Sequence, residues 1–202
     1  MRKIPGLFML KTKSSEADTE RVNPECLWVL DRAVPITVTV KRDGTAMMRK
    51  DGKWYQRRVL KVHTVAGGVS GTLPAPNGFE PAQVAPTYDQ ENRQLEWPGW
   101  VPLSEQYREA MVEAQMELCV DDGTYELCGP KINGNPEQLE KHTLFRHGSE
   151  VIEVSDLLVR SKEIIIQIVK LTRAEGIVIY GSGDRKAKVK RREFRFDWPI
   201  CR

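Results

Sequence analysis

Alternation of β-branched and polar residues predicts several short strands along the chain. Valine, isoleucine and threonine alternate over residues 34–40, which is typical of a strand. Residues 46–49 and 53–59 flank Lys50-Asp51-Gly52, and an Asp-Gly pair between two such segments predicts a hairpin. Further strands are expected at residues 124–128, 175–180 and 185–189.

Two other segments carry hydrophobic residues at helical spacing. The first is expected to begin at Ser104, which can cap a helix, and to run to about residue 119. Its apolar face would comprise Tyr107, Met111, Ala114 and Leu118. The second spans residues 155–172, with Leu158, Ile165 and Ile168 on one stripe, and its isoleucine density leaves a strand possible for part of it.

Gly and Pro are dense over residues 66–100, which predicts a long irregular loop of the kind that is usually functional or mobile. Strands therefore predominate, with helices against them, and we expect an α+β fold of antiparallel sheets with flanking helices. A chain of 202 residues is enough for one sizeable core, so a single domain over residues 1–202 is expected.

Composition narrows the class of protein. With 40% hydrophobic and 29% charged residues and no apolar run of 18, the sequence is that of a globular protein with no membrane span. The N-terminal residues lack the apolar core of a signal peptide. The cysteines, Cys26, Cys119, Cys128 and Cys201, show no Cys-x-x-Cys spacing, so we expect reduced thiols, no zinc site and a cytoplasmic location.

Charge is more informative in its distribution than in its sum, because a net charge of +3 alone does not indicate a polyanionic partner. Only Glu193 interrupts a basic run composed of Arg185, Lys186, Lys188, Lys190, Arg191, Arg192 and Arg195. Such a run can neutralise phosphates, but it is equally typical of an exposed edge strand that lysines protect from pairing.

One lysine stands where a nucleophile could be held. Lys41 begins Lys41-Arg42-Asp43-Gly44 directly after a predicted strand, where burial and nearby cations would lower its pKa and leave a neutral amine. The same four residues can also be a simple turn. We assign that second interpretation to the similar Lys50-Asp51-Gly52.

Two carboxylates and two lysines could complete such a site. Glu126 and Glu175 lie in or before short apolar strands, where carboxylates could hold Mg²⁺ or orient a ribose, although isolated glutamates are more often surface residues. Lys188 and Lys190 fall on one face of a strand, where they would suit an α-phosphate or simply form an exposed edge.

Taken in order, these residues resemble the lysine-nucleotidyltransferase superfamily of polynucleotide ligases and capping enzymes. Within it, the sequence is similar to the small family of ATP-dependent 5′–3′ RNA ligases of the human RNA ligase 1 type. The matching segments, beyond the lysine motif, are Pro98-Gly99-Trp100-Val101-Pro102, Ile132-Asn133-Gly134-Asn135-Pro136, His147-Gly148, Glu175-Gly176-Ile177-Val178, Lys188-Val189 and Trp198-Pro199. They extend from about residue 34 to 200.

The resemblance implies an ATP-grasp-like adenylation domain that joins RNA 5′-phosphate and 3′-hydroxyl ends. ATP would adenylate Lys41 in the presence of Mg²⁺ or Mn²⁺, AMP would pass to the RNA 5′ end, and a 3′-hydroxyl would displace it. The implied metal ligands are Glu175 and Glu126. The implied nucleotide-binding residues are Asp43, Gly44, Arg58, Glu126, Phe145, Lys188 and Lys190.

Individual roles follow from the same resemblance. Asp43 and Gly44 shape the turn, and Asp43 holds a neighbouring basic group. Arg58 contacts the ribose or the RNA 5′-phosphate, and Phe145 stacks on adenine. Lys186 competes with Lys188 for the α-phosphate. Asn133 and Asn135 either bond RNA or close a turn, with the turn slightly favoured.

Two other functions fit the sequence less well. Capping guanylyltransferases use the same lysine with GTP, but these enzymes and DNA ligases carry an OB-fold, and only about a dozen residues follow Lys190 here. A non-catalytic RNA-binding protein on the same core would be expected to lack Lys41 or the glutamates, which are present.

Overall fold

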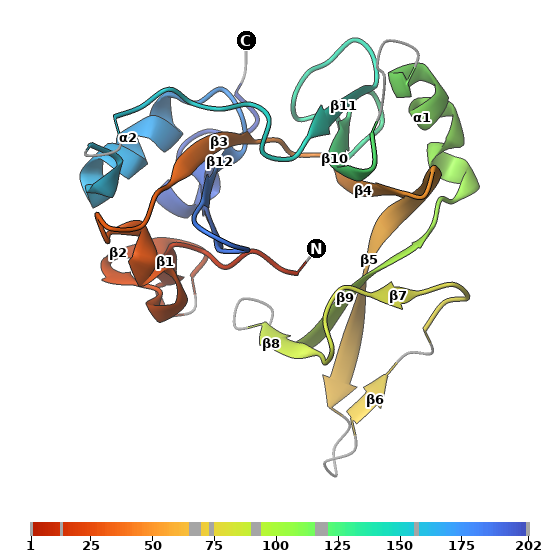
Figure 1. Ribbon diagram of the computed structural model, residues 1–202, viewed down its shortest axis with the longest axis horizontal. Helices are drawn as coiled ribbons and strands as arrows, with labels where there is room; N and C mark the ends of the chain where they lie inside the picture. Colours follow the sequence, from red (N-terminus) through yellow and green to blue (C-terminus); the bar gives the residue numbers. More distant parts are fainter. Residues whose placement is uncertain are drawn as a thin grey trace.

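The computed structural model describes residues 2–12, 14–64, 70–72, 75–89, 94–115, 121–155 and 158–200. Within these ranges the strands form three sheets whose strand pairs are antiparallel, accompanied by two α-helices (Figure 1). The expected α+β class with antiparallel sheets is confirmed. None of the described helices is long and apolar enough to cross a membrane.

A three-stranded sheet forms one half of the site. Its order is β13 (Lys186–Lys190), β12 (Gly176–Tyr180) and β3 (Thr37–Lys41). One face is apolar and packs against α2 (Lys162–Leu171), and its buried residues are Val38, Ile177, Ile179, Ala187 and Val189. The same core receives Leu7 and Phe8 from the small sheet of β1 (Phe8–Leu10) and β2 (Ala17–Val22).

A larger sheet forms the other half. Its path runs through β11 (Thr143–Arg146), β10 (Gly123–Cys128), β4 (Thr45–Lys50), β5 (Lys53–Thr64), β9 (Gln94–Pro102) and β7 (Glu80–Pro81). Off this path, β6 (Ser70–Thr72) pairs with β5 and β8 (Thr87–Asp89) pairs with β9.

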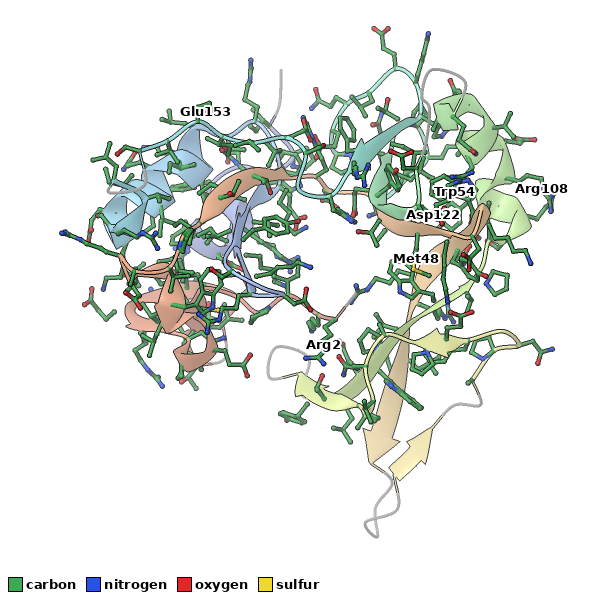
Figure 2. The ribbon with its side chains drawn as sticks, viewed as in Figure 1. Arg2, Met48, Trp54, Arg108, Asp122 and Glu153 are labelled. Carbon is green, nitrogen blue, oxygen red and sulfur yellow. The ribbon has the colours of Figure 1, made fainter. Side chains whose placement is uncertain are left out.

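The larger sheet has its own core, which lies under α1 (Arg108–Gln115). Met47, Tyr125, Leu127 and Leu144 pack with Met111 on this side. Trp54 lies beside α1 (Figure 2), and its Nε1 donates to Gln115 Oε1 at 3.0 Å. The three-stranded sheet therefore turns an apolar face to α2, and the larger sheet turns one to α1. The opposite face of each sheet is available for polar groups.

The predicted strands outside the Gly- and Pro-rich segment are confirmed, with small shifts at their ends. The hairpin at Lys50-Asp51-Gly52 is also confirmed, with positive φ at both Asp51 (51°) and Gly52 (72°), as a two-residue hairpin turn of this type requires.

The long irregular loop predicted over residues 66–100 is wrong, because β7, β8 and most of β9 fall within it. Gly99 lies inside β9, where an added Cβ would be 2.3 Å from the Phe79 ring. The glycine is explained by a ring that packs against the backbone rather than by a break in the strand.

Both predicted helices begin differently from the expectation. The first is a 3-10 turn (Glu105–Tyr107) followed by α1, and the Ser104 hydroxyl donates to Gln56 Oε1 at 2.7 Å instead of capping it. The predicted residues Leu118 and Cys119 lie outside the described ranges.

The second helix, α2, starts seven residues later than predicted, because Ser161 rather than Ser155 supplies the N-terminal cap by accepting from Ile164 N at 3.4 Å. Ile165 is fully buried and Ile168 packs against the core, as predicted. Leu158 is outside this helix in a 3-10 turn and is 54% exposed, so its place on the stripe was wrong.

Candidate functional site

Lys41 is the last residue of β3, at the point where the chain leaves one sheet for the other. Its ammonium is in direct contact with a Glu175 oxygen, and Lys190 Nζ lies 3.4 Å from the second oxygen of the same carboxylate. Gly176 pairs directly with both Lys41 and Lys190, so the register of the sheet brings these groups together. Glu175 is therefore held between two lysines.

This arrangement determines the protonation of Lys41. Burial alone would lower the pKa of the ammonium, but the negative charges of Glu175 and Glu126 outweigh it and raise the pKa. The expectation of a lowered Lys41 pKa is therefore wrong for the protein without ligand. Burial likewise works to raise the pKa of Glu175, and the charges of Lys41 and Lys190 overcome it and lower that pKa.

Lys188 has the opposite electrostatic environment. Burial, together with the positive charges of Lys190, Lys41 and Lys3, lowers its pKa to about 8. Among the described residues its ammonium has neither a hydrogen bond nor an ion pair. A mostly buried lysine surrounded by other lysines is a favourable place for an anion.

Lys186 is placed differently from Lys188, although both project from the same face of β13. It pairs with Tyr180 at the far end of the sheet, whereas Lys41 pairs with Gly176 at the near end. Its ammonium donates to Asp184 at 3.0 Å. The structure therefore brings Lys188 and Lys190, but not Lys186, to Lys41.

Glu126 approaches Lys41 from the larger sheet. Its Oε1 accepts from Gly44 N at 3.1 Å, and its Oε2 lies 2.8 Å from His147 Nε2. An added Cβ on Gly44 would lie 2.2 Å from the Leu127 carbonyl oxygen, so only glycine allows the turn to approach β10 this closely.

Asp43 braces the turn through neutral donors. Trp198 Nε1 donates to its Oδ2 at 2.9 Å, and Asn133 Nδ2 lies 3.4 Å from its Oδ1. The expectation that Asp43 holds a neighbouring basic group is wrong, because Arg42 is bound by Glu137 and Glu150 instead.

Asn133 and Asn135 both bond to turns of this chain, Asn133 to the turn after Lys41 and Asn135 within its own loop. Asn133, in a left-handed conformation with φ of 48°, donates to the Gly44 carbonyl at 2.6 Å. Asn135 exchanges hydrogen bonds with the backbone of Leu139. The turn interpretation of these asparagines is the one that the structure supports.

The predicted site arginine, Arg58, and its neighbour Arg57 lie on opposite faces of β5. Residues that pair directly across antiparallel strands share a face, and this rule places Arg57 on the Glu126 face of the larger sheet. Arg58 is exposed and points to the other face, away from Glu126. Burial lowers the pKa of Arg57, while the charges of Glu126 and Glu96 oppose that shift. Of these two arginines, Arg57 is therefore the one on the Glu126 face.

Phe145 pairs with Glu126 and lies beside the site, as expected. The Arg42 guanidinium, however, lies over its ring, 4.5 Å from the centroid. One ring face is thus covered in the protein without ligand, so stacking of adenine there requires either the other face or movement of Arg42.

Several contributors were not assigned a role from the sequence. His147 and Trp198 belong to segments that carry the family resemblance, so the resemblance was a signal for them. Lys3 carried no signal. Its Nζ lies 3.0 Å from Glu96 Oε2 on β9, and its charge acts on Lys188 from the N-terminal segment.

The fit to Mg²⁺ differs between the two predicted ligands. In the part of the chain that the structure describes, no three His, Cys, Asp or Glu residues gather as a protein-only metal site. Mg²⁺ commonly uses one or two carboxylates together with substrate phosphates. Both Glu175 oxygens contact lysines, so Glu175 fits that mode once the cation replaces Lys41 at one of them. Both Glu126 oxygens already accept hydrogen bonds, so Glu126 fits a water-mediated role better than direct ligation.

The basic run from Arg185 to Arg195 does not form one surface. Arg191 is buried and donates to the carbonyls of Val169, Lys170 and Thr172, which is a structural role. Arg195 pairs with Glu16 on the outside. The run contributes Lys188 and Lys190 to the site rather than a continuous basic track.

Comparison of the chain with protein-family models and with curated proteins finds no match in either.

Glu137 bonds two residues of the turn after Lys41, so its removal is expected to lower the stability of the protein. Glu137 is buried and accepts from Asp43 N and from Arg42 NH1, both at 2.9 Å. Glu137→Ala should lower the free energy of unfolding in urea by about 1–3 kcal/mol, because two donors lose their acceptor. Glu140→Ala, at an exposed position of the same loop, should change it by less than about 0.5 kcal/mol. Equal effects from both substitutions would contradict this role for Glu137.

Proposed function

We propose that this protein is an ATP-dependent RNA ligase with a nucleotidyltransferase fold, in which Lys41 becomes adenylated. The observation that carries the proposal is the lysine face of the three-stranded sheet. Lys41 lies against Glu175 there, and the half-buried Lys188 beside it has no hydrogen-bonded or ion-paired anion among the described residues. A nucleotide phosphate supplies the charge that this arrangement lacks.

In the first step the Lys41 amine forms a bond to the α-phosphorus of ATP, and the bond from that phosphorus to pyrophosphate breaks. The ammonium must first lose its proton, because only the neutral amine attacks. Glu175 holds the proton on Lys41 in the protein without ligand. Release of the amine therefore requires that the charge of Glu175 be taken up by another cation.

Two sources of positive charge are available for that exchange. Lys190 already contacts the second oxygen of Glu175. Mg²⁺ held by Glu175 and the phosphates would supply the rest and neutralise the departing pyrophosphate. Lys188 is placed to hold the α-phosphate while the bonds exchange, which is the positioning that phosphoryl transfer needs most.

In the second step an RNA 5′-phosphate oxygen displaces Lys41 from AMP, which restores the amine and leaves a 5′–5′ pyrophosphate. In the third step a 3′-hydroxyl attacks the RNA phosphorus, loses its proton and releases AMP. Arg57, on the Glu126 face, is placed to bind the ribose or the RNA 5′-phosphate. Glu126 is placed to orient the ribose, since Gly44 and His147 fix both of its oxygens.

The nucleophile is tested by labelling with ATP that carries a radioactive α-phosphate. Lys41→Ala should abolish covalent label on a denaturing gel, because the proposal assigns the attack to Lys41 and only charge balance to Lys190, the other lysine at Glu175. Lys50→Ala, which changes an exposed lysine paired with Glu80, should retain the label. Label on the Lys41 variant would exclude Lys41 as the nucleophile, and preferential labelling by GTP would indicate a capping enzyme instead.

The phosphate-binding lysine is tested by the rate of the same labelling. Lys188→Ala should slow adenylation by about a hundredfold to a thousandfold, the usual effect of losing one preorganised charge contact. Lys186→Ala changes a lysine of the same strand face that instead bonds Asp184, and should label within about twofold of the unaltered protein. Equal losses in both variants would mean that the register of the site is wrong.

The arginine assignment is tested by joining of 5′-phosphorylated RNA. Arg57→Ala should slow joining by about tenfold to a hundredfold, because a hydrogen bond to a charged group is worth about 1.5–3 kcal/mol. Arg58→Ala provides the matched control, since its side chain lies on the other face of β5. A slow Arg58 variant beside a normal Arg57 variant would reverse the assignment.

A further inference from the structure

A cavity of about 1120 Å³ lies beside the lysine site and is not part of it. Its walls come from the N-terminal segment, residues 2–12, and from the region of β8 that includes Gln83, Thr87 and Tyr88. Lys188 lines it as well, so it opens next to the residue that we place on the α-phosphate. Figure 2 shows Arg2 in the space between the N-terminal segment and β8.

Backbone hydrogen bonds fix the N-terminal segment against the three-stranded sheet of β13, β12 and β3, called the lysine sheet below. Lys188 N donates to the Pro5 carbonyl and Leu7 N donates to the Lys188 carbonyl, both at 2.9 Å. Asn23 Nδ2 adds a bond of 3.1 Å to the Gly6 carbonyl. The segment therefore continues the edge of β13 and holds its first residues beside Lys188.

The lining of the cavity carries more basic than acidic side chains. Basic side chains from Arg2, Lys3, Lys11 and Lys188 line it, against Glu25 and Glu193. Glu193 is buried and accepts a hydrogen bond from Lys190 N at 3.2 Å. The opposing partners outside the lining are Glu96 for Lys3, Glu16 for Lys11 and the nearby Asp184 for Arg2. The pair of Lys11 and Glu16 is largely exposed on the lysine side, so it holds Lys11 only weakly.

An aromatic ring stands at the same cavity. Tyr88 on β8 is 60% exposed, so most of its side chain is accessible to a partner in the cavity. Cationic groups that follow a phosphate backbone, combined with an exposed ring on which a base can stack, are how proteins hold single-stranded nucleic acid. A triphosphate alone would use the cations and leave the ring without a role.

We propose that this cavity binds the single-stranded RNA that leads to the reactive end, with Arg2 and Lys11 on phosphates and Tyr88 stacked on a base. The inference rests on the proposed function, since it names the path by which the RNA substrate reaches Lys188. It also assigns the N-terminal segment to the RNA site. The ion pair of Lys3 with Glu96 on β9 connects that segment to the larger sheet and holds it in place.

The test measures binding of a fluorescent single-stranded RNA with a 5′-phosphate by anisotropy, without ATP, over a range of salt concentrations. Tyr88→Ala should weaken binding by roughly tenfold or more, and Tyr88→Phe, which keeps the ring, should not. The double substitution Arg2→Ala with Lys11→Ala should lower the slope of log affinity against log salt by about 1.4, or roughly 0.7 for each phosphate contact. Arg32→Ala, an exposed arginine outside the cavity, is the matched control.

Binding and salt slope unchanged in the Tyr88→Ala and double variants would overturn the inference. Covalent labelling by ATP is measured on the same proteins, and a parallel fall there would assign the cavity to the triphosphate and also overturn the RNA path. The proposed function fails separately. If unaltered protein binds RNA through the cavity but Lys41 is never labelled, the ligase assignment is lost and the RNA site remains.

Discussion

The contact of Lys41 with Glu175 fixes the geometry and the charge of the site together. The two residues are far apart in sequence and meet because β3 and β12 pair so that Gly176 lies opposite Lys41. The same register places Lys190 on the other side of the carboxylate. A shift by one residue in either pairing would turn the lysines toward the apolar core. The core residues Ile177, Ile179 and Val189 therefore determine the position of the site, since they are the opposite face of the same strands.

The short connection between β3 and β4, Arg42 to Gly44, carries the chain from the three-stranded sheet to the larger sheet, and several polar groups around it hold it in place. Glu126 binds the Gly44 amide, Asn133 the Gly44 carbonyl, and Trp198 the Asp43 carboxylate. Arg42 is bound by two carboxylates and covers Phe145. These contacts come from loops distant in sequence, so the segments at residues 132–136 and 198–199 converge on the turn that follows Lys41.

What the sequence predicted well was local. Alternation and the Asp-Gly pair identified most strands, and Lys188 and Lys190 were correctly placed on one face. What failed depended on distant partners. Arg57 and Arg58 differ only in face, and the face is set by pairing with β4. The start of the second helix was predicted seven residues too early, because the cap at Ser161 was not identified. The pKa of Lys41 could not be inferred from burial alone, because the dominant opposing charge is contributed by a residue 134 positions away.

The fold places the charge of Lys188 in an unfavourable environment that a bound anion would make favourable. An ammonium that is partly removed from water without an anionic partner is costly. The charge of Glu193 acts on Lys188, but the carboxylate of Glu193 accepts its hydrogen bond from the Lys190 amide. The low pKa of Lys188 does not conflict with phosphate binding, since an approaching phosphate stabilises the charged form and raises the pKa again. The cost therefore falls mainly on the ligand-free protein. Binding of an anion stabilises the folded state by relieving it, which couples the stability of the lysine sheet to occupation of the site.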